Sequence, residues 1–240
     1  MSLIVFGSKP AWNTPDFSPF VIKLETWLRL AGIPYERRNG GNPLQAPKGK
    51  IPYIELDGQR IGDSQLIIET LTERFGVTLD AGLSPRELAL ARMVRRALEE
   101  GTYFAAVRLR WVEEDGWVRQ YPAFKVLFPA FIAPVAIPMI RRKVRSAAMA
   151  QGVGRHSREE VMAMAVDDLA ALEALLGDQP YLLGEAPRSV DATVYAFLIA
   201  IQRHPGATGV HLAARSPRLM AYTERLAAAY WPPTELTRAS

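Results

Sequence analysis

The sequence predicts a two-part protein, an N-terminal α/β unit with a small mixed sheet followed by an all-helical part. Strand and helix patterns alternate over roughly the first third of the 240 residues, in the order βα, then β, then ββα. A crossover and a hairpin in one unit combine parallel and antiparallel strand pairs, so we expect a mixed four-stranded sheet with helices on both faces. Beyond that point only helical patterns remain. We therefore predict domains at residues 1–78 and 84–240.

The first half of the α/β unit begins with a short apolar strand, Leu3–Phe6. After a proline-rich loop, apolar residues at helical spacing predict a helix from about Pro19 to Ala31, and Gly32-Ile33-Pro34 ends it. Tyr35–Arg38 can form a second strand. Residues 39–50 form a loop rich in glycine, asparagine and proline.

The second half of this unit is a hairpin followed by a helix. Tyr53–Leu56 alternates as a half-buried strand does, Asp57-Gly58 is a strong turn signal, and Arg60-Ile61 begins the return strand. Asp63-Ser64 then opens a helix that runs to about Phe75. Pro52 breaks the pattern, because proline cannot donate a hydrogen bond to a sheet and yet stands where this strand begins.

Two helix starts in the C-terminal part are marked by Ser-x-x-Glu capping boxes, at Ser84 and at Ser157. A further helix is predicted from Arg188 or Ser189 to about Arg203, and another from Pro217 to Ala229.

The run from Phe124 to Ile140 is apolar, and Pro129, Pro134 and Pro138 are expected to break it. It is followed by basic residues, so one interpretation is an interfacial membrane anchor. The alternative, which we favour, is an apolar hairpin packed in the helical domain or at a subunit contact. The run is too short and too rich in proline to span a membrane.

The composition argues against several kinds of chemistry. The chain has no cysteine, so any thiol must belong to a ligand. His156, His204 and His211 stand in no ligand spacing, so we expect no metal site. The net charge of +4, from 29 basic and 25 acidic residues, suits a small anionic ligand. No basic motif is interleaved with aromatics, so we expect no nucleic-acid partner. No signal-peptide pattern is visible, and a cytoplasmic location is expected.

Four short motifs, in order and at suitable spacing, resemble the glutathione transferase superfamily over nearly the whole chain. Asn42-Pro43 with Gly49-Lys50-Ile51-Pro52 resembles that family's NP...GKVP, and Asp63-Ser64 resembles its Glu/Asp-Ser pair. Leu183-Gly184 through Asp191-Ala192 resembles the LxG...SxAD pattern of its helical domain. Ser18-Pro19-Phe20 and the helix that follows resemble the metaxin and failed-axon-connections-like branch.

This resemblance implies the glutathione transferase architecture, a thioredoxin-like N-terminal domain with an all-α C-terminal domain, and glutathione as co-substrate. In the family the proline after the GK pair is cis, and the residue before it, here Ile51, pairs its backbone with glutathione as an added strand would. Lys50, Ile51 and Pro52 are therefore candidate glutathione-binding residues. Asp63 and Ser64 at the start of the next helix would hold the γ-glutamyl end, although from the residues alone they also suit a simple cap. The resemblance further implies a homodimer and a small electrophilic second substrate.

A glutathione transferase needs a group that favours the thiolate of glutathione, because a free thiol has a pKa of ~8.5. Ser18 matches the serine of an SPF-type motif and is the candidate catalytic residue. Serine followed by proline is also what any helix start prefers, so capping alone is the competing interpretation. Trp12, Asn13 or Thr14 could instead reach the sulfur, because the loop from Gly7 to Phe17 is longer than in most of the family.

Other residues are more ambiguous. Asp191 resembles the structural aspartate of a buried capping box, but Arg188 stands where the partner hydroxyl belongs, unless Ser189 supplies it. Side chains on the long first helix of the C-terminal part could line an acceptor-substrate pocket, although a solvated face is the ordinary role of such charges. These are Arg95, Arg96, Tyr103, Arg108, Arg110 and Trp111.

Two functions from different classes follow. The first is an enzyme that adds the glutathione thiolate to a small electrophile. The second is a non-catalytic relative that uses the same two-domain body for protein interaction or membrane-peripheral binding.

Overall fold

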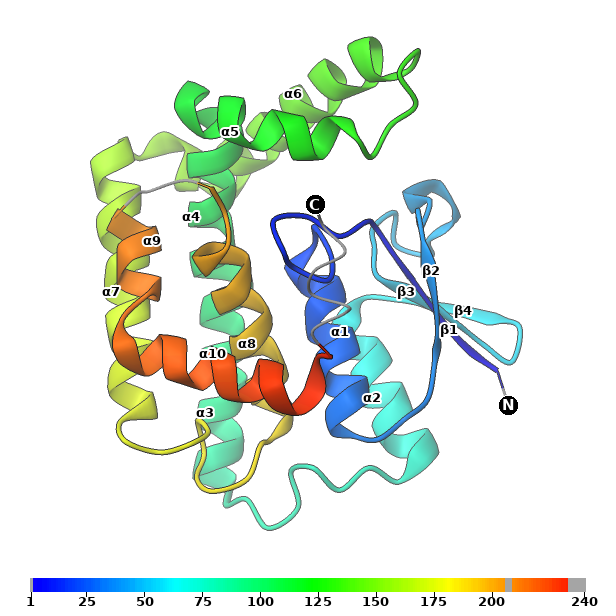
Figure 1. The fold of residues 1–240 in the computed structure, drawn as a ribbon, viewed down its shortest axis with the longest axis vertical. Helices are drawn as coiled ribbons and strands as arrows, with labels where there is room; N and C mark the ends of the chain where they lie inside the picture. Colours follow the sequence, from blue (N-terminus) through cyan, green and yellow to red (C-terminus); the bar gives the residue numbers. More distant parts are fainter. Residues whose placement is uncertain (1, 206–208, 233–240) are drawn as a thin grey trace.

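The computed structural model describes residues 2–205 and 209–232 (Figure 1). Its N-terminal part consists of the elements β1 (Leu3–Gly7), α1 (Pro19–Leu30), β2 (Glu36–Asn39), the 3₁₀ turn η1 (Pro43–Gln45), β3 (Tyr53–Leu56), β4 (Gln59–Gly62) and α2 (Ser64–Phe75). The strand order is β2-β1-β3-β4, with β1 parallel to β2 and the other two pairs antiparallel. The predicted mixed four-stranded sheet is confirmed, and Asp57-Gly58 forms its hairpin turn with positive φ at both residues.

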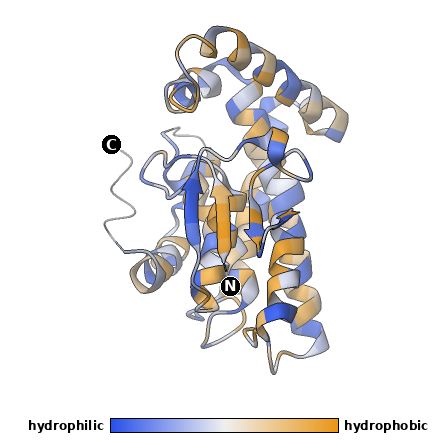
Figure 2. Cartoon of the chain, turned by 90° about the vertical axis from the view of Figure 1, so that its right-hand side faces the viewer, coloured by the Kyte–Doolittle hydropathy of each residue, from blue (hydrophilic) through white to orange (hydrophobic). Residues whose placement is uncertain are grey.

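The expectation of helices on both faces of the sheet is wrong, because α1 and α2 lie on the same face (Figure 1, Figure 2). The segment 39–50 forms only one 3₁₀ turn and supplies no helix for the other face. There the rings of Phe6 and Tyr53 stack with centroids 4.5 Å apart. The guanidinium groups of Arg38 and Arg60 lie 5.9 and 6.0 Å from the Phe6 ring. Long arginine side chains thus shield apolar surface that a helix would otherwise cover.

The helical part begins at Pro85. Its elements are α3 (Pro85–Arg96), the π-helical turn η2 (Ala97–Thr102), α4 (Tyr103–Val107), the π-helical turn η3 (Arg108–Val112), α5 (Glu114–Lys125), α6 (Ala133–Gln151), the 3₁₀ turn η4 (Val153–Arg155), α7 (Arg158–Leu176), α8 (Ser189–Gln202), α9 (Gly209–Ala214) and α10 (Pro217–Tyr230). Both predicted capping boxes are confirmed, with reciprocal side-chain and backbone bonds at Ser84 and at Ser157.

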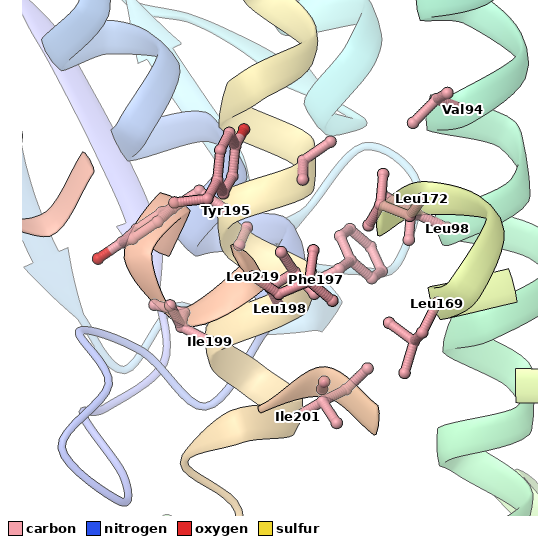
Figure 3. Packing of buried hydrophobic residues seen from close by; sticks show 14 of the residues in the cluster. Val94, Leu98, Leu169, Leu172, Tyr195, Phe197, Leu198, Ile199, Ile201 and Leu219 are labelled. Carbon is pink, nitrogen blue, oxygen red and sulfur yellow. The ribbon is translucent and has the colours of Figure 1, made fainter. Parts of the chain in front are cut away.

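The core of the helical part surrounds α8, which is buried over almost its whole length. Figure 3 shows Phe197 of α8 packed near Leu98 of η2 and Leu172 of α7. Helix α1 packs against α8 from the side of the sheet, so residues 21–28 of α1 are all buried. The three polar residues in that stretch therefore need partners inside the protein.

The expected break at Pro134 and Pro138 is wrong. α6 contains both prolines, with Pro134 in its first turn and Pro138 in its interior. A proline in the first turn costs no hydrogen bond, because that N–H has no intrahelical partner anyway. Pro138 lies near the start of the helix and removes one backbone bond, which the fold tolerates. Only the segment around Pro129 separates α5 from α6.

Across the described ranges, we find no helix with the length and apolar character that a membrane span requires.

Candidate active site

The register of the sheet brings the candidate segments together at one end. Phe6 of β1 pairs with Tyr53 of β3, and Tyr53 pairs with Gly62 of β4. One residue further along each strand, in the same direction, lie Gly7 at the end of β1, Pro52 just before β3 and Asp63 just after β4. The loop that leads to Ser18, the Ile51-Pro52 pair and the start of α2 therefore leave the sheet at the same end.

The peptide bond between Ile51 and Pro52 is cis, as expected. Ile51 lies outside the β1–β3 ladder, and in the described residues its backbone N–H and C=O take part in no hydrogen bond. Gly41 lies against it, where an added Cβ would come within 3.2 Å of the Ile51 Cγ2 atom and 3.1 Å of the Gly7 carbonyl. Lys50 is exposed, and Pro52 is buried. Ile51 thus keeps backbone groups that an extended peptide could pair with.

At the start of α2, Asp63 is the N-cap. Its Oδ1 atom accepts from the N–H groups of Gln65 at 2.9 Å and Leu66 at 3.2 Å. Asp63 has a φ of 82°, a region that residues other than glycine rarely adopt. The capping interpretation of Asp63 is therefore confirmed, which leaves its Oδ2 atom for a ligand.

Ser64 is buried, and its Oγ accepts a 3.3 Å hydrogen bond from Lys23 Nζ. Because the hydroxyl accepts this bond, its own proton stays free to be donated to an anion at the start of the helix.

Lys23, which the sequence did not single out, organises this corner. Its ammonium group, 1% exposed, donates to Gln65 Oε1 at 3.1 Å and pairs with Glu99 Oε1 of η2 at 2.6 Å. Arg95 joins the pair by a 3.0 Å bond to the other oxygen of Glu99. Burial lowers the pKa of Lys23, and the nearby Glu99 opposes that change. The network ties α1, α2 and the helical part together directly beneath Ser64.

A signal for Lys23 was present in the sequence. It stands in the apolar run of α1, between Ile22 and Leu24, where a lysine without a buried acid would be costly. The partner Glu99 lies 76 residues away, and nothing in the sequence pattern connects the two.

At the start of α1, Ser18 occupies the N-cap position, but its side chain makes no capping bond. Its hydroxyl has no partner in the described part of the chain and is not among the buried polar atoms there, so solvent can reach it. The backbone N–H of Ser18 donates instead to Asp16 Oδ1 at 2.7 Å. The competing interpretation, that the Ser18 hydroxyl caps α1, is therefore wrong.

Asp16 fixes this backbone from inside the protein. It is 1% exposed and accepts a 3.0 Å bond from the Ser8 hydroxyl and a 2.5 Å bond from the Arg37 guanidinium. Arg37 also pairs with the buried Glu25 of α1. Burial raises the pKa of Asp16 to about 7, while Arg37 works in the opposite direction. Two buried carboxyls thus share one guanidinium next to Ser18.

Among the alternative residues of the loop, Trp12 and Thr14 make contacts elsewhere through their side chains, and Asn13 does so through its backbone carbonyl. The Thr14 hydroxyl is buried and donates toward the carbonyls of Ala11 and Asp16, at 2.5 and 2.8 Å. The ring of Trp12 lies edge-on to His204 with centroids 4.6 Å apart. The Asn13 carbonyl accepts from Arg203 of the helical part. The loop therefore braces the two parts of the molecule, and Ser18 is its best-placed hydroxyl for a ligand.

Aromatic residues stand on either side of Ser18 in the sequence, at Phe17 and Phe20. Phe17 packs against Phe124 with ring centroids 5.6 Å apart. Phe20 meets Tyr103 at 5.0 Å and Phe197 at 5.3 Å. The segment around Ser18 therefore meets the helical part through aromatic rings.

The arginines of the long helix differ in their partners. Arg95, Arg96 and Arg108 each pair with a glutamate. Arg110 has no ion pair within the described residues, and it donates to the Ala200 carbonyl at 2.8 Å. Burial lowers the pKa of Arg110 to about 10. Of the four, Arg110 is the one whose charge is not already matched by a carboxylate.

Asp191 braces the helical part, as its structural interpretation predicts. Its carboxylate accepts from the N–H groups of Arg188 at 2.7 Å and Leu182 at 3.0 Å, and from the Tyr222 hydroxyl at 2.7 Å. Within the described residues the Ser189 hydroxyl makes no bond to Asp191 and accepts instead from the Trp27 indole, so Ser189 is not its capping partner.

Comparison with known proteins places this geometry in a family. A glutathione S-transferase N-terminal domain model matches residues 19–116, and a glutathione S-transferase C-terminal domain model matches residues 165–226. The isoprene-epoxide glutathione S-transferase of Rhodococcus sp. (strain AD45) is 35% identical over 237 residues, which cover 95% of this chain and 99% of that protein.

Two other relatives are longer proteins. Failed axon connections of Drosophila melanogaster is 29% identical over 77% of this chain and 46% of its own length. Metaxin-1 of Homo sapiens is 27% identical over 92% of this chain, and the match spans about half of its length, 49%.

Solved structures agree on the fold. A beta-etherase from Sphingobium sp. strain SYK-6 superposes with a TM-score of 0.66 at 20% identity and 98% coverage of both chains. A glutathione S-transferase III in its apo form gives a TM-score of 0.64 at 18% identity, covering 100% of this chain and 99% of that one. The two domain-model matches and the 35% identity to the Rhodococcus enzyme over 95% of this chain show that the chain belongs to the glutathione S-transferase family.

Proposed function

We propose that this protein conjugates glutathione to a small electrophile, with Ser18 as the catalytic residue. The observation that carries the proposal is the Ser18 hydroxyl, which stands at the N-cap of α1 and is free of any capping bond. A hydroxyl in that place, together with the positive end of the helix, can donate to a sulfur anion and favour thiolate over thiol.

The remaining candidate residues bind and orient the peptide. The backbone N–H and C=O of Ile51, which take no part in the ladder, pair with the cysteinyl backbone. Ser64 donates its free proton to the γ-glutamyl carboxylate, and Asp63 offers Oδ2 to the ammonium group. Lys50 stands exposed beside this row and can attract the anionic tripeptide.

The electrophile lies on the aromatic side, against Phe17, Phe20 and Tyr103. The Rhodococcus relative is named for an isoprene epoxide, so small alkene epoxides are the first class to test. The thiolate attacks a ring carbon, a C–S bond forms as the C–O bond breaks, and the resulting alkoxide takes a proton from water. Holding both reactants in place supplies much of the rate.

Calorimetry with glutathione and turnover of a small alkene epoxide test the proposal together. We expect saturable glutathione binding and formation of a thioether product. A protein that binds no glutathione and turns over neither an epoxide nor an aryl halide would support the non-catalytic interaction module instead.

We also propose that the protein is a homodimer in which the N-terminal part of one subunit meets the helical part of the other across a two-fold axis. Light scattering should give twice the monomer mass of 26.7 kDa at micromolar concentration. A mass that stays at the monomer value argues against this assembly.

We also propose a cytoplasmic location, because the cytoplasm holds the reduced glutathione that the proposed reaction uses. Cell fractionation with an antibody to the chain tests it.

A further inference from the structure

The charges of this chain are segregated along the sequence. Residues 116–158, which include most of α5 and all of α6, contain eight of the 29 basic residues and none of the 25 acidic ones. The rest of the chain therefore carries a net charge of −4, although the whole chain carries +4. We call the α5–α6 hairpin the arm, and it lies at one end of the molecule (Figure 1).

The inner side of the arm is packed and paired. Ala133 and Ile137 are 1% exposed and form a cluster with Trp117 and Phe124. Arg141 donates to the Trp111 carbonyl at 3.0 Å and pairs with Glu114 at 2.8 Å. Phe124, Ala133 and Ile137 of the apolar run are therefore core residues, as expected for an apolar hairpin packed in the helical domain.

The outer side of the arm has apolar side chains in solvent. Phe131 is 82% exposed, Val135 66% and Met139 67%, and Val126 at the end of α5 is 62% exposed. Val135 and Met139 are four residues apart, so they lie on one face of α6. Four such residues on one short hairpin form a patch rather than scattered exposure.

Basic side chains follow the apolar ones along the same helix. Arg142, Lys143 and Arg145 are exposed and form no ion pair within the described part of the chain. An open groove of about 440 Å³ runs beside them, lined by Pro138, Arg141, Arg142, Arg145, Ser146 and Met149. Arginines and apolar side chains thus share one surface, with the apolar end at the tip of the arm.

We propose that the outer side of the arm docks on an anionic lipid bilayer. Phe131, Val135 and Met139 enter the boundary between headgroups and acyl chains, and Arg142, Lys143 and Arg145 contact the lipid phosphates. Outside α5, α6 and the segment between them, the remaining 23 basic and 23 acidic residues balance, so the rest of the chain has no net attraction to the anionic surface.

Two other occupants fit less well. A symmetric contact between two copies would bring Arg142, Lys143 and Arg145 of one copy against the same residues of the other, because a two-fold interface places the same patch on both sides. A nucleic acid would match the arginines, but its phosphate backbone offers nothing to bury the aliphatic Val135 and Met139. A bilayer offers acyl chains to the apolar residues and phosphates to the basic residues of the arm.

Vesicle sedimentation with the full chain tests the proposal. We expect binding to vesicles that contain phosphatidylglycerol and little binding to pure phosphatidylcholine, with a decrease as ionic strength rises. Lys143→Glu/Arg145→Glu should weaken this binding about 30-fold or more. The matched control, Arg86→Glu/Arg92→Glu on α3, makes the same charge change at exposed sites outside the arm and should weaken it less than about 3-fold.

The apolar half has its own test. Phe131→Ser/Val135→Ser should lower vesicle binding about 10-fold even at raised ionic strength, because burial of apolar area is not screened by salt. Circular dichroism and the melting temperature check that each variant is folded.

The proposal is overturned if the wild type fails to bind anionic vesicles at low ionic strength, or if the control variant loses as much binding as the arm variant. It is also overturned if the arm variant instead loses affinity for duplex nucleic acid, or loses a concentration-dependent increase in mass by light scattering, with vesicle binding intact.

Discussion

At the start of α2 the chain engages the nearby side chains, whereas at the start of α1 it leaves a hydroxyl without a partner. Asp63 caps α2, and Ser64 beside it accepts from a buried ammonium group. Ser18 has the dihedral angles of an N-cap and makes no cap, because Asp16 takes its backbone N–H. The two helix starts therefore differ in the group that they leave available to a ligand, the Asp63 Oδ2 atom and the Ser64 proton at α2 and the Ser18 hydroxyl at α1.

The difference has a physical origin. An exposed cap residue such as Asp63 satisfies helix donors that water would otherwise bond. At α1 the proline at the first helical position removes one donor, so the helix needs less from Ser18. A free hydroxyl at a helix N-terminus is then available to a ligand.

The largest expected effect is on the network beneath Ser64. Lys23→Met should lower the free energy of unfolding by about 3–5 kcal/mol, because it leaves the buried Glu99 with only Arg95 as a partner. Urea denaturation measures it. Arg95→Met is the matched control and should cost much less, since Lys23 remains. Equal losses in both variants would mean that Lys23 is not the main partner of Glu99.

The second prediction concerns the carboxyl that holds Ser18. Burial raises the pKa of Asp16 from 3.8 to about 7, so between these values the folded state holds a proton that the unfolded chain has released. The free energy of unfolding should therefore fall as pH rises from about 4 to about 7, by roughly 3 kcal/mol relative to Asp16→Asn. Denaturation curves collected across this pH range compare the two proteins. Parallel pH profiles would show that Asp16 does not titrate there.

The third prediction separates activation from capping. Ser18→Ala should lower turnover about 10- to 1,000-fold, the range for loss of one preorganised donor, with glutathione affinity nearly unchanged. Its free energy of unfolding should stay within about 0.5 kcal/mol of the wild type, because no capping bond is lost. Steady-state kinetics and urea denaturation supply both numbers. A variant that loses stability and keeps its turnover would restore the capping interpretation.

Ser64→Ala should act in the opposite way. Glutathione affinity should fall by about 1–2 kcal/mol through loss of the hydroxyl donor, while turnover at saturating glutathione changes little. Calorimetry and kinetics on the same preparation measure the two effects. Unchanged affinity would remove Ser64 from the binding residues.

The smallest expected effect is the loss of stability on removing the Asp63 cap of α2. Asp63→Ala should lower the free energy of unfolding by about 1 kcal/mol, because Oδ1 bonds two backbone N–H groups at the start of α2. Asp63→Asn keeps an oxygen in this place and is the control. If the alanine variant is as stable as the wild type, the two helix starts do not differ as described.

The sequence predicts most of the fold around the two helix starts, but it does not predict which side chains bond to each other there. The hairpin, the two capping boxes and the mixed sheet follow from local patterns such as Asp57-Gly58 and Ser84. The partner of Lys23 lies 76 residues away, and the packing of α1 against the helical part brings the two together. Arg37 lies 12 residues from Glu25 and 21 from Asp16, and no local pattern pairs these residues. Whether Ser18 caps its helix depends on which atom its N–H reaches, and local pattern cannot decide that.

The pKa of the glutathione thiol when bound tests the central claim most directly. Ultraviolet absorbance of the thiolate, titrated against pH with glutathione bound, reports it for the wild type and for Ser18→Ala. We predict a wild-type value at least about one unit below the free thiol's ~8.5, and a return toward that value in Ser18→Ala. A bound thiol with the free value in the wild type, or the same lowered value in both proteins, would contradict the assignment of Ser18.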